Sequence, residues 1–420
     1  EELNRIGGFP NIFPNDPTHP LVRDLIRPIR NTRSLSPDLR IPYSLQSSLG
    51  IERQFGRTLA LEISYVFNRT LRLWRDRNVN APIPPPGGFV AFLLDPPENF
   101  PGVVRAPDGK TAFDNSARQI ADVGVRFVRF DLSATRSRDI GSGANRIRIY
   151  GLNALGGGAT TTDPVLAALN AVRWLRPNPD LGEVEQLQSD GQATYHGLNV
   201  LASARLARRL WVRASYTLSK LIDLVDVNTS SPQDEFNFAL ERGLGRTDER
   251  HRFVLSGTLA MPKVLGGWEL TPLVTLSSGR PFNITTNAQD RNLSDTLTDR
   301  PHVLGQGPIR FVKPGDTARS EAMAARFLFP TIGTNGTLGR NMGRGPGTRR
   351  VDVRLSREVR VSERLRLRPW VNAYNLLNTP NFIMTGFYGP LDEREGRSVF
   401  LQPRAARRPR TLELGLRVEF

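Results

Sequence analysis

Hydrophobic and polar residues alternate along nine stretches of the chain, each 10 to 15 residues long. In residues 58–69, for example, the odd positions from Leu59 to Phe67 are apolar, whereas most even positions are polar or small. A period of two predicts a β-strand with one apolar and one polar face. The predicted strands are residues 43–53, 58–69, 196–206, 210–222, 251–260, 267–278, 349–360, 364–378 and 410–420.

The strand lengths and the links between strands together indicate the fold class. Soluble strands average about 5–6 residues, whereas tilted membrane strands need about 9–11. Short links (54–57, 207–209, 261–266, 361–363) alternate with long ones (70–195, 223–250, roughly 279–350, 379–409). Outer-membrane barrels have such tight periplasmic turns and longer extracellular loops. We therefore predict an all-β fold, an antiparallel transmembrane β-barrel in the Gram-negative outer membrane.

Nine strands is an odd number, whereas bacterial single-chain barrels have an even one. The chain begins at Glu1 with no signal peptide. We therefore expect the C-terminal portion of a larger barrel, in which residues 1–42 form an extracellular loop entering the fragment and residues 43–420 form the barrel portion. The partner of strand 43–53 is expected upstream, because open strand edges are not tolerated in lipid.

Composition excludes several other classes. No stretch approaches the roughly 20 apolar residues of a transmembrane helix, and the absence of Cys removes disulfides and thiol chemistry. The formal charge is +16, but the 57 basic residues are spread along the chain and include only four Lys. We expect no nucleic-acid partner, although a soluble basic β-protein that binds nucleic acid stays open as an alternative.

The sequence predicts no enzyme. The four His residues have no metal-ligand spacing, and there is no Gly-x-Ser-x-Gly or Walker sequence. We therefore expect no catalytic, cofactor or metal site, and we interpret the glycine-rich run Gly339–Gly347 as a loop turn rather than a phosphate cradle. Two stretches inside long loops, 165–172 after Asp163-Pro164 and 316–327, have helix signals.

Any ligand would meet the polar side of the strands or the outer loops. In each strand, alternate positions face the same side, and this places the following residues on the polar side, toward the lumen: Arg213, Ser215, Thr217, Arg354, Arg366, Arg368 and Asn372. An inward row of arginines would favour anionic solutes, but packing against a plug domain explains the same residues. Aromatic residues near the strand ends, among them Tyr65, Tyr216 and Trp268, are typical of interfacial girdles.

Several motifs resemble the barrel of TonB-dependent outer-membrane receptors of the Oar-like group, which carries a carboxypeptidase-regulatory-like domain. They include Pro42–Arg53, Arg77–Pro82, Tyr195–Leu198, Ala214–Lys220, Asp248–Gly257, Gly339–Asn341, Gly345–Gly347 and Asn375–Phe382, and the resemblance covers residues 41–420. It implies a barrel of about 22 strands with a plugged lumen, coupled to TonB through a segment absent from this chain.

The final strand stops on Phe420, which resembles the signal that the barrel-assembly machinery recognises in outer-membrane proteins. The expected function is therefore uptake or passage of an unidentified ligand through the outer membrane. A passive porin, or a structural or adhesin barrel, is the alternative within the same fold class.

Overall fold

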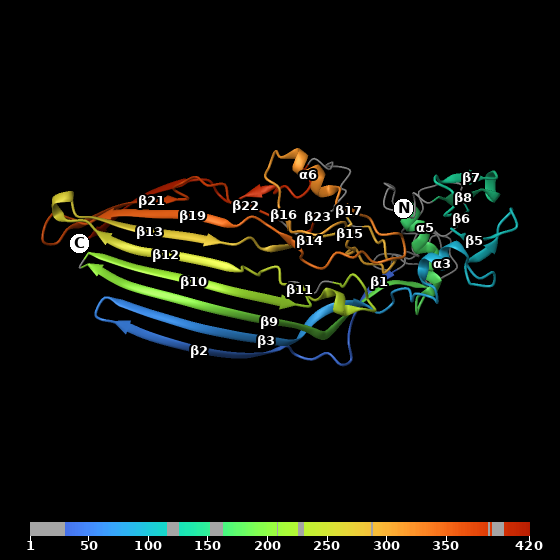
Figure 1. The fold of residues 1–420 in the computed structure, drawn as a ribbon, viewed down its shortest axis with the longest axis horizontal. Coiled ribbons are helices and arrows are strands. Elements are labelled where there is room, and N and C mark those ends of the chain that lie inside the picture. The colour runs from blue at the N-terminus through green and yellow to red at the C-terminus, as the bar shows by residue number, and fades with distance from the viewer. Residues whose placement is uncertain are drawn as a thin grey trace, which may run out of the picture.

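The largest feature of the molecule is a curved, open sheet whose long strands follow the chain order (Figure 1). The computed structural model describes residues 30–115, 126–151, 163–207, 209–225, 231–286, 289–384, 387–388 and 399–420. From one edge to the other, the long strands are β2 (Tyr43–Phe55), β3 (Leu59–Asn78), β9 (Leu181–Ala207), β10 (Leu210–Asp223), β12 (His251–Ala260), β13 (Trp268–Ser277), β19 (Thr348–Arg357), β21 (Arg366–Tyr374) and β25 (Thr411–Glu419). Neighbouring long strands pair antiparallel, and each lies on one of the nine predicted stretches.

The pairing register gives all of these strands one common polar face and one common apolar face. Arg213 of β10 lies opposite Ser203 of β9 and Ser256 of β12, and the pattern continues across the sheet. The apolar face is open to its surroundings: Leu49, Ile51 and Leu414 are 75%, 73% and 77% exposed. Apolar surface of this extent is characteristic of a wall that faces lipid rather than water.

The short connections all lie at the end of the sheet where the chain terminates (Figure 1). They join β2 to β3, β9 to β10, β12 to β13 and β19 to β21. The turn before β3 uses Gly56 at φ 62°, and that before β13 uses Gly266 and Gly267 at φ 85° and 63°. These are left-handed conformations that glycine adopts without steric cost. The strand β20 (Val359–Arg360) pairs with β21 near the last of these turns.

At the opposite, outer end, the strands differ in length from the prediction. β3 and β9 have 20 and 27 residues and stay paired as far as Asn78 and Glu185. The link predicted over 70–195 is therefore shorter at both ends. An additional strand, β1 (Arg30–Leu35), pairs parallel with residues 181–187 of β9, within the stretch expected to be loop; residues 1–29 lie outside the described part.

The position of β1 has a simple physical cause. β10 pairs with β9 only from Ala193 onward, so the outer part of β9 would have a free edge there. β1 supplies backbone partners for that edge, and Arg33 forms an ion pair with Glu185 across the pair. The sequence Arg30–Leu35 has no apolar alternation, which is why the pattern of hydrophobic positions did not predict this strand.

Beyond the outer end, the segment between β3 and β9 folds on a core of its own. Its elements are α3 (Gly88–Leu94), β4 (Val103–Arg105), β5 (Thr111–Asp114), β6 (Phe127–Phe130), β7 (Arg138–Ile140), η1 (Gly143–Asn145), β8 (Ile147–Tyr150), α5 (Asp163–Val172) and η2 (Arg173–Leu175). Leu93, Phe113, Phe130 and Ala168 are almost fully buried in that core. The helix predicted over 165–172 is confirmed as α5.

A second outer unit is formed mainly by the segment between β13 and β19. It contains β14 (Pro281–Ile284), β15 (His302–Val303), β16 (Ile309–Arg310), α6 (Thr317–Ala324), β17 (Phe327–Leu328) and β18 (Gly343–Arg344), joined by β22 (Phe382–Ile383), β23 (Phe387–Tyr388) and β24 (Ala405–Ala406). Ile284, Phe327 and Leu401 are buried at its centre. The predicted helix 316–327 is confirmed in shorter form, with the Asp316 carboxylate accepting a hydrogen bond from the Arg319 amide.

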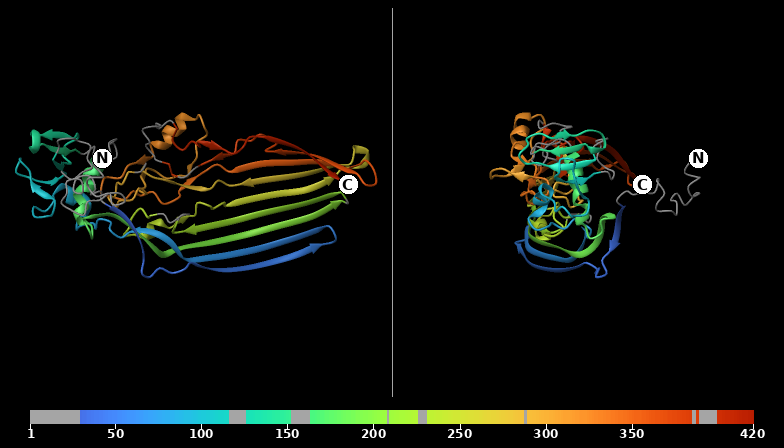
Figure 2. Two further views of the ribbon diagram at one scale, coloured as in Figure 1. Left: turned by 180° about the vertical axis from the view of Figure 1, so that it is seen from behind. Right: turned by 90° about the vertical axis from the view of Figure 1, so that its right-hand side faces the viewer.

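Smaller elements complete the fold: β11 (Gly243–Leu244) pairs with the outer end of β10, and η3 (Phe238–Glu241) and η4 (Lys263–Leu265) are short helical turns. Figure 2 shows that both outer units lie beyond the same end of the sheet, away from the C-terminus. We refer to them together, with residues 231–250, as the outer layer. None of the described helices is both long and apolar enough to span a membrane.

Two tyrosine–histidine pairs occupy the apolar face toward its outer end. The Tyr65 hydroxyl lies 2.6 Å from Nδ1 of His196, and the Tyr216 hydroxyl lies 2.8 Å from Nδ1 of His251. Each pair joins neighbouring strands and gives the polar end of the tyrosine a partner within an apolar surface. Trp268 and Phe420 share the same face at the opposite end, and the 97% exposed side chain of Phe420 ends the last strand.

Candidate ligand-binding site

The seven residues predicted to face the lumen all lie on the polar face of the sheet. β10 carries Arg213, Ser215 and Thr217, β19 carries Arg354, and β21 carries Arg366, Arg368 and Asn372. Arg354 and Asn372 are directly opposite each other. The register does not gather the seven into one site, because they are distributed from the turn end to the outer end. Their role in ligand binding stays a prediction.

Several of these side chains already have partners within the protein. The Thr217 hydroxyl donates to Oδ1 of Asn199 at 2.8 Å. The Arg354 guanidinium lies 4.9 Å from the centre of the Trp370 ring. At the turn end, Arg368 and Arg366 approach the Glu358 carboxylate at 2.8 and 4.0 Å. The predicted row of arginines is therefore charge-compensated at that end.

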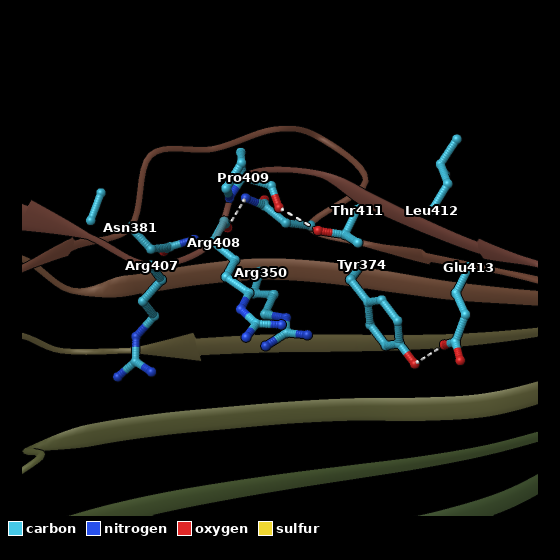
Figure 3. A pocket seen from close by; sticks show the side chains of 11 residues that line it. Arg350, Tyr374, Asn381, Arg407, Arg408, Pro409, Thr411, Leu412 and Glu413 are labelled. Carbon is cyan, nitrogen blue, oxygen red and sulfur yellow. Dashed lines mark hydrogen bonds between the residues drawn. The ribbon is translucent and has the colours of Figure 1, made fainter.

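The arginines gather instead around a cavity of about 840 Å³ at the outer end of β19, β21 and β25. Residues that line it include Arg350, Tyr374, Asn375, Arg407, Arg408 and Glu413. Figure 3 shows the side chains of Arg350, Arg407, Tyr374 and Glu413 extending to one side of the ribbon and Leu412 extending to the other. The register places Tyr374 and Glu413 on the polar face and Leu412 on the apolar face. The cavity therefore opens toward the polar face.

Three asparagines of the stretch 375–382 build the frame of this cavity. The Asn375 side chain bonds both the amide and the carbonyl of Thr379, at 3.0 Å each, and the Asn381 side chain bonds those of Arg349 at 2.7 and 2.9 Å. Asn378 accepts a hydrogen bond from the Arg410 amide at 3.0 Å. Asn375 and Asn378 have φ of 50°, which asparagine tolerates better than most residues. The motif thus fixes the ends of three strands together.

This cavity was not predicted from the sequence, although the positions of three of its lining residues along the strands were informative. Arg350, Tyr374 and Glu413 have polar-face parity on predicted strands, as do the candidates that were chosen. Arg407 and Arg408 lie in the link 379–409, where alternation gives no information on side-chain direction. Long-range contacts bring that link over the strand ends. They include the pairing of Asn381 with Arg349 and the 2.8 Å backbone hydrogen bond from Arg407 to Asn381.

A second cavity, of about 920 Å³, shares Asn381 with the first. Its lining includes five cationic residues: Arg250, Arg310, Lys313, Arg344 and Arg349. The buried Asp248 carboxylate orients two of them, with Arg344 at 3.1 Å and Arg250 at 3.9 Å, and also accepts from the Leu221 amide. The outer rim of β13 and β19 is therefore strongly positive.

The glycine-rich run 339–347 serves close packing. A Cβ on Gly279 would lie 1.7 Å from the Gly345 carbonyl oxygen, and one on Gly347 would lie 2.4 Å from that of Ser277. These glycines let two backbones touch. Within the predicted turn, Gly343–Arg344 forms strand β18, which pairs with β14 and β16. Among the described residues, no group of three or more His, Asp or Glu side chains could hold a metal ion.

Buried ion pairs join the segments of the outer layer to one another and, through Asp223, to the end of β10. Arg300, 2% exposed, donates to both oxygens of Glu241 at 2.8 and 3.1 Å. Arg340 pairs with Asp223 and donates to the Glu241 carbonyl at 2.6 Å. Arg176 pairs with Asp295 at 2.6 Å. These contacts connect three links that are distant in sequence.

Several carboxyl groups at the same junction favour their neutral forms. Burial raises the pKa of Glu235 to about 8 and that of Asp299 to about 7. The pKa of Asp290 is raised as well, first by burial and then by the nearby Asp299. The charged form of each group is disfavoured where water is excluded.

Comparison with known proteins places these features in a family. The model of the family described as "Outer membrane beta barrel domain" matches residues 4–400. No curated protein matches the sequence significantly.

Among solved structures, the chain is similar to the outer membrane transporter YddB from Escherichia coli, with a TM-score of 0.42, 8% identity, and coverage of 93% of this chain and 34% of that one. The FrpB iron transporter from Neisseria meningitidis gives a TM-score of 0.38 with 9% identity, covering 93% and 33%. The pyoverdine outer membrane receptor FpvA from Pseudomonas aeruginosa gives 0.39 and 9%, covering 93% and 31%. The chain thus spans about one third of the length of each.

Proposed function

We propose that the chain is part of a TonB-dependent transporter. The proposal starts from two facts: the chain belongs to the outer membrane beta barrel domain family, and it lies in the outer membrane of a Gram-negative cell. In this proposal the sheet is a section of the wall of a larger, plugged barrel. The outer layer forms part of its extracellular mouth, and a ligand passes along the polar face. Energy coupling to TonB is implied by the sequence resemblance to the Oar-like group.

The observation that carries the proposal is the open sheet with one polar and one exposed apolar face. In the described residues, the outer edges of β2 and β25 have no strand partner along their length. Unpaired backbone groups in hydrocarbon cost several kcal/mol each, so a wall of this kind needs further strands to close it. We infer that those strands and the plug belong to a longer protein.

A conductance measurement tests this proposal without knowledge of the ligand. The full-length protein would be inserted in a planar lipid bilayer and its steady ion current recorded. A plugged transporter is expected to be closed and to conduct only after its plug domain has been deleted from the gene. A steady open current from the full-length protein would instead indicate a passive porin.

Energy coupling requires a second measurement. Once a transported or toxic probe has been found for the full-length protein in cells, its entry is expected to be lost when the tonB gene is deleted. Entry at the same rate with and without TonB would contradict the coupling while leaving the membrane location unaffected.

A further inference from the structure

We propose that the cavity at the outer end of β19, β21 and β25 binds a solute that carries two or more carboxylate or phosphate groups. The inference rests on the proposed function, which provides the reason for a solute to reach the polar face. It adds the chemical class of that solute and the residues that recognise it.

The charge of the cavity favours an anion. Three guanidinium groups line it, and Glu413 is the one acidic side chain among its described lining residues. The Glu413 carboxylate already accepts hydrogen bonds from the Tyr374 hydroxyl at 3.0 Å and the Asn372 amide at 3.2 Å. In the described part of the chain, Arg407 and Arg408 have no ion-pair partner, so an incoming anion would meet uncompensated positive charge.

The type and spacing of the cations point to more than one anionic group. Arg presents a planar fork of donors that binds carboxylate and phosphate in a bidentate manner, and it keeps its charge at any physiological pH. Arg350 comes from the start of β19, whereas Arg407 and Arg408 come from the link before β25. Two separate segments therefore contribute guanidiniums to one cavity (Figure 3). A solute with several anionic groups would engage both segments at once.

The cavity is built before any ligand arrives. Asp352 holds Arg350 at 2.8 Å and also accepts from the Asn375 amide at 2.8 Å, so the guanidinium is anchored to the asparagine frame. Arg407 donates its amide to the Asn381 carbonyl, and Asn381 is 4% exposed. Fixing the binding groups in advance lowers the entropic cost of association. The side chains of Arg407 and Arg408 are exposed, so in that segment it is the backbone that is fixed in advance.

Size and surroundings agree with a small solute. The volume of about 840 Å³ lies within the range of roughly 300–1,000 Å³ that is usual for ligand pockets. The adjoining cavity, with its five cationic lining residues, adds positive potential at the same rim. Such a field increases the local concentration of anions and their rate of association.

Lipid phosphate is the competing source of the same chemistry, and the geometry disfavours it. Leu412 faces the apolar side of β25, whereas the arginines that form the cavity extend to the other side (Figure 3). A lipid in the outer leaflet meets the apolar face. A soluble anion on the polar face is therefore the occupant that we propose.

The test uses the full-length protein in detergent, with citrate and inorganic tripolyphosphate as probes in isothermal titration calorimetry. We expect both probes to bind, with an affinity that falls as salt is raised. The double substitution Arg350→Gln with Arg407→Gln is expected to weaken binding at least tenfold. The control Arg319→Gln removes one positive charge from the exposed surface of α6 and is expected to leave affinity unchanged.

Three outcomes would overturn the inference. In the first, neither probe binds the unsubstituted protein, and in the second, the double variant binds the probes as tightly as the unsubstituted protein does. In the third outcome, lipopolysaccharide bound at the apolar face displaces the probes. Heat-modifiable mobility on gels verifies that each variant is folded. Because titration needs neither TonB nor an energised membrane, its failure leaves the transport proposal to the conductance and uptake measurements. A failure of those measurements likewise leaves the titration result standing.

Discussion

The sheet and the outer layer keep their shape by opposite means. The sheet has a face of exposed Leu, Ile and Val side chains and is held by long antiparallel pairing, as between the 13 residues of β2 and the facing part of β3. The outer layer buries its apolar residues in separate cores and joins its segments through buried ion pairs such as Arg300–Glu241. The sheet thus depends on lipid around it, whereas the outer layer depends on charges paired inside it.

The largest effect is expected from breaking the central ion pair of the outer layer. Arg300→Met leaves Glu241 buried without its main partner, and removal of one member of a buried pair costs about 3–5 kcal/mol. Hydrogen exchange of the full-length protein should show faster exchange in the outer layer and unchanged protection in β10 and β12. The double variant Arg300→Met with Glu241→Leu should recover part of the loss. Equal destabilisation of strands and outer layer would show that the two regions are not separate.

The converse experiment places a charge on the apolar face. Leu414 lies near the middle of β25, and an arginine at the bilayer midplane of a barrel costs about 2–4 kcal/mol. We expect Leu414→Arg to lower the free energy of unfolding in lipid vesicles by that amount. Ser215→Arg, on the polar face, is the matched control and should cost less than about 1 kcal/mol. Similar losses in both variants would contradict the assignment of the faces.

Acidity separates the regions further, because Glu235, Asp290 and Asp299, whose carboxyl pKa values are raised by burial, lie in the outer layer. An acid whose pKa is raised on folding stabilises the folded state most below its unfolded value, about 4.5 for Glu235, and that contribution is lost as pH rises toward about 8. We expect the outer layer to become more sensitive to protease over this range. Glu235→Gln should flatten the dependence. A dependence that is unchanged by this substitution would exclude Glu235 as its source.

The smallest effect is expected at the junction of the two regions. Asn381→Ala removes two side-chain hydrogen bonds to the backbone of Arg349, each contributing about 1 kcal/mol. Hydrogen exchange should increase in residues 405–410, with a loss of about 1–2 kcal/mol in local stability. Leu377→Ala, at a side chain that is 67% exposed in the same turn, serves as the control. No change in residues 405–410 would mean that the asparagine does not hold this segment.

The two regions also differ in how far the sequence predicted them. Period-two alternation located the nine long strands, because a wall with one apolar and one polar face imposes that pattern on every strand. It did not predict β1, whose sequence Arg30–Leu35 is polar and whose place depends on a free edge of β9. The helix-start signal at Asp163-Pro164 located α5, and the stretch 316–327 was predicted as a helix that the structure shows in shorter form as α6.

The binding cavity was beyond sequence reasoning for a related reason. Parity assigns a face to residues on strands, and it placed Arg213 and Arg354 on the polar side. Arg407 and Arg408 lie in a link whose path is set by contacts between Asn381, Arg349 and the strand ends. Such contacts join residues that are far apart in the sequence, so no local pattern records them.

A cysteine scan of β25 tests the two-faced wall most directly, and the 420 residues of this chain contain no Cys that would be labelled as well. Single Cys substitutions at positions 412 to 418 of the full-length protein would be labelled in intact outer membranes with a membrane-impermeant maleimide. We predict alternating labelling, in which the Glu413 and Arg417 positions react and the Leu412, Leu414, Leu416 and Val418 positions are protected by lipid. The Gly415 position is not scored, because a Cβ there would collide with the Trp370 ring. Uniform labelling along the strand, or protection of the polar positions instead, would contradict the account.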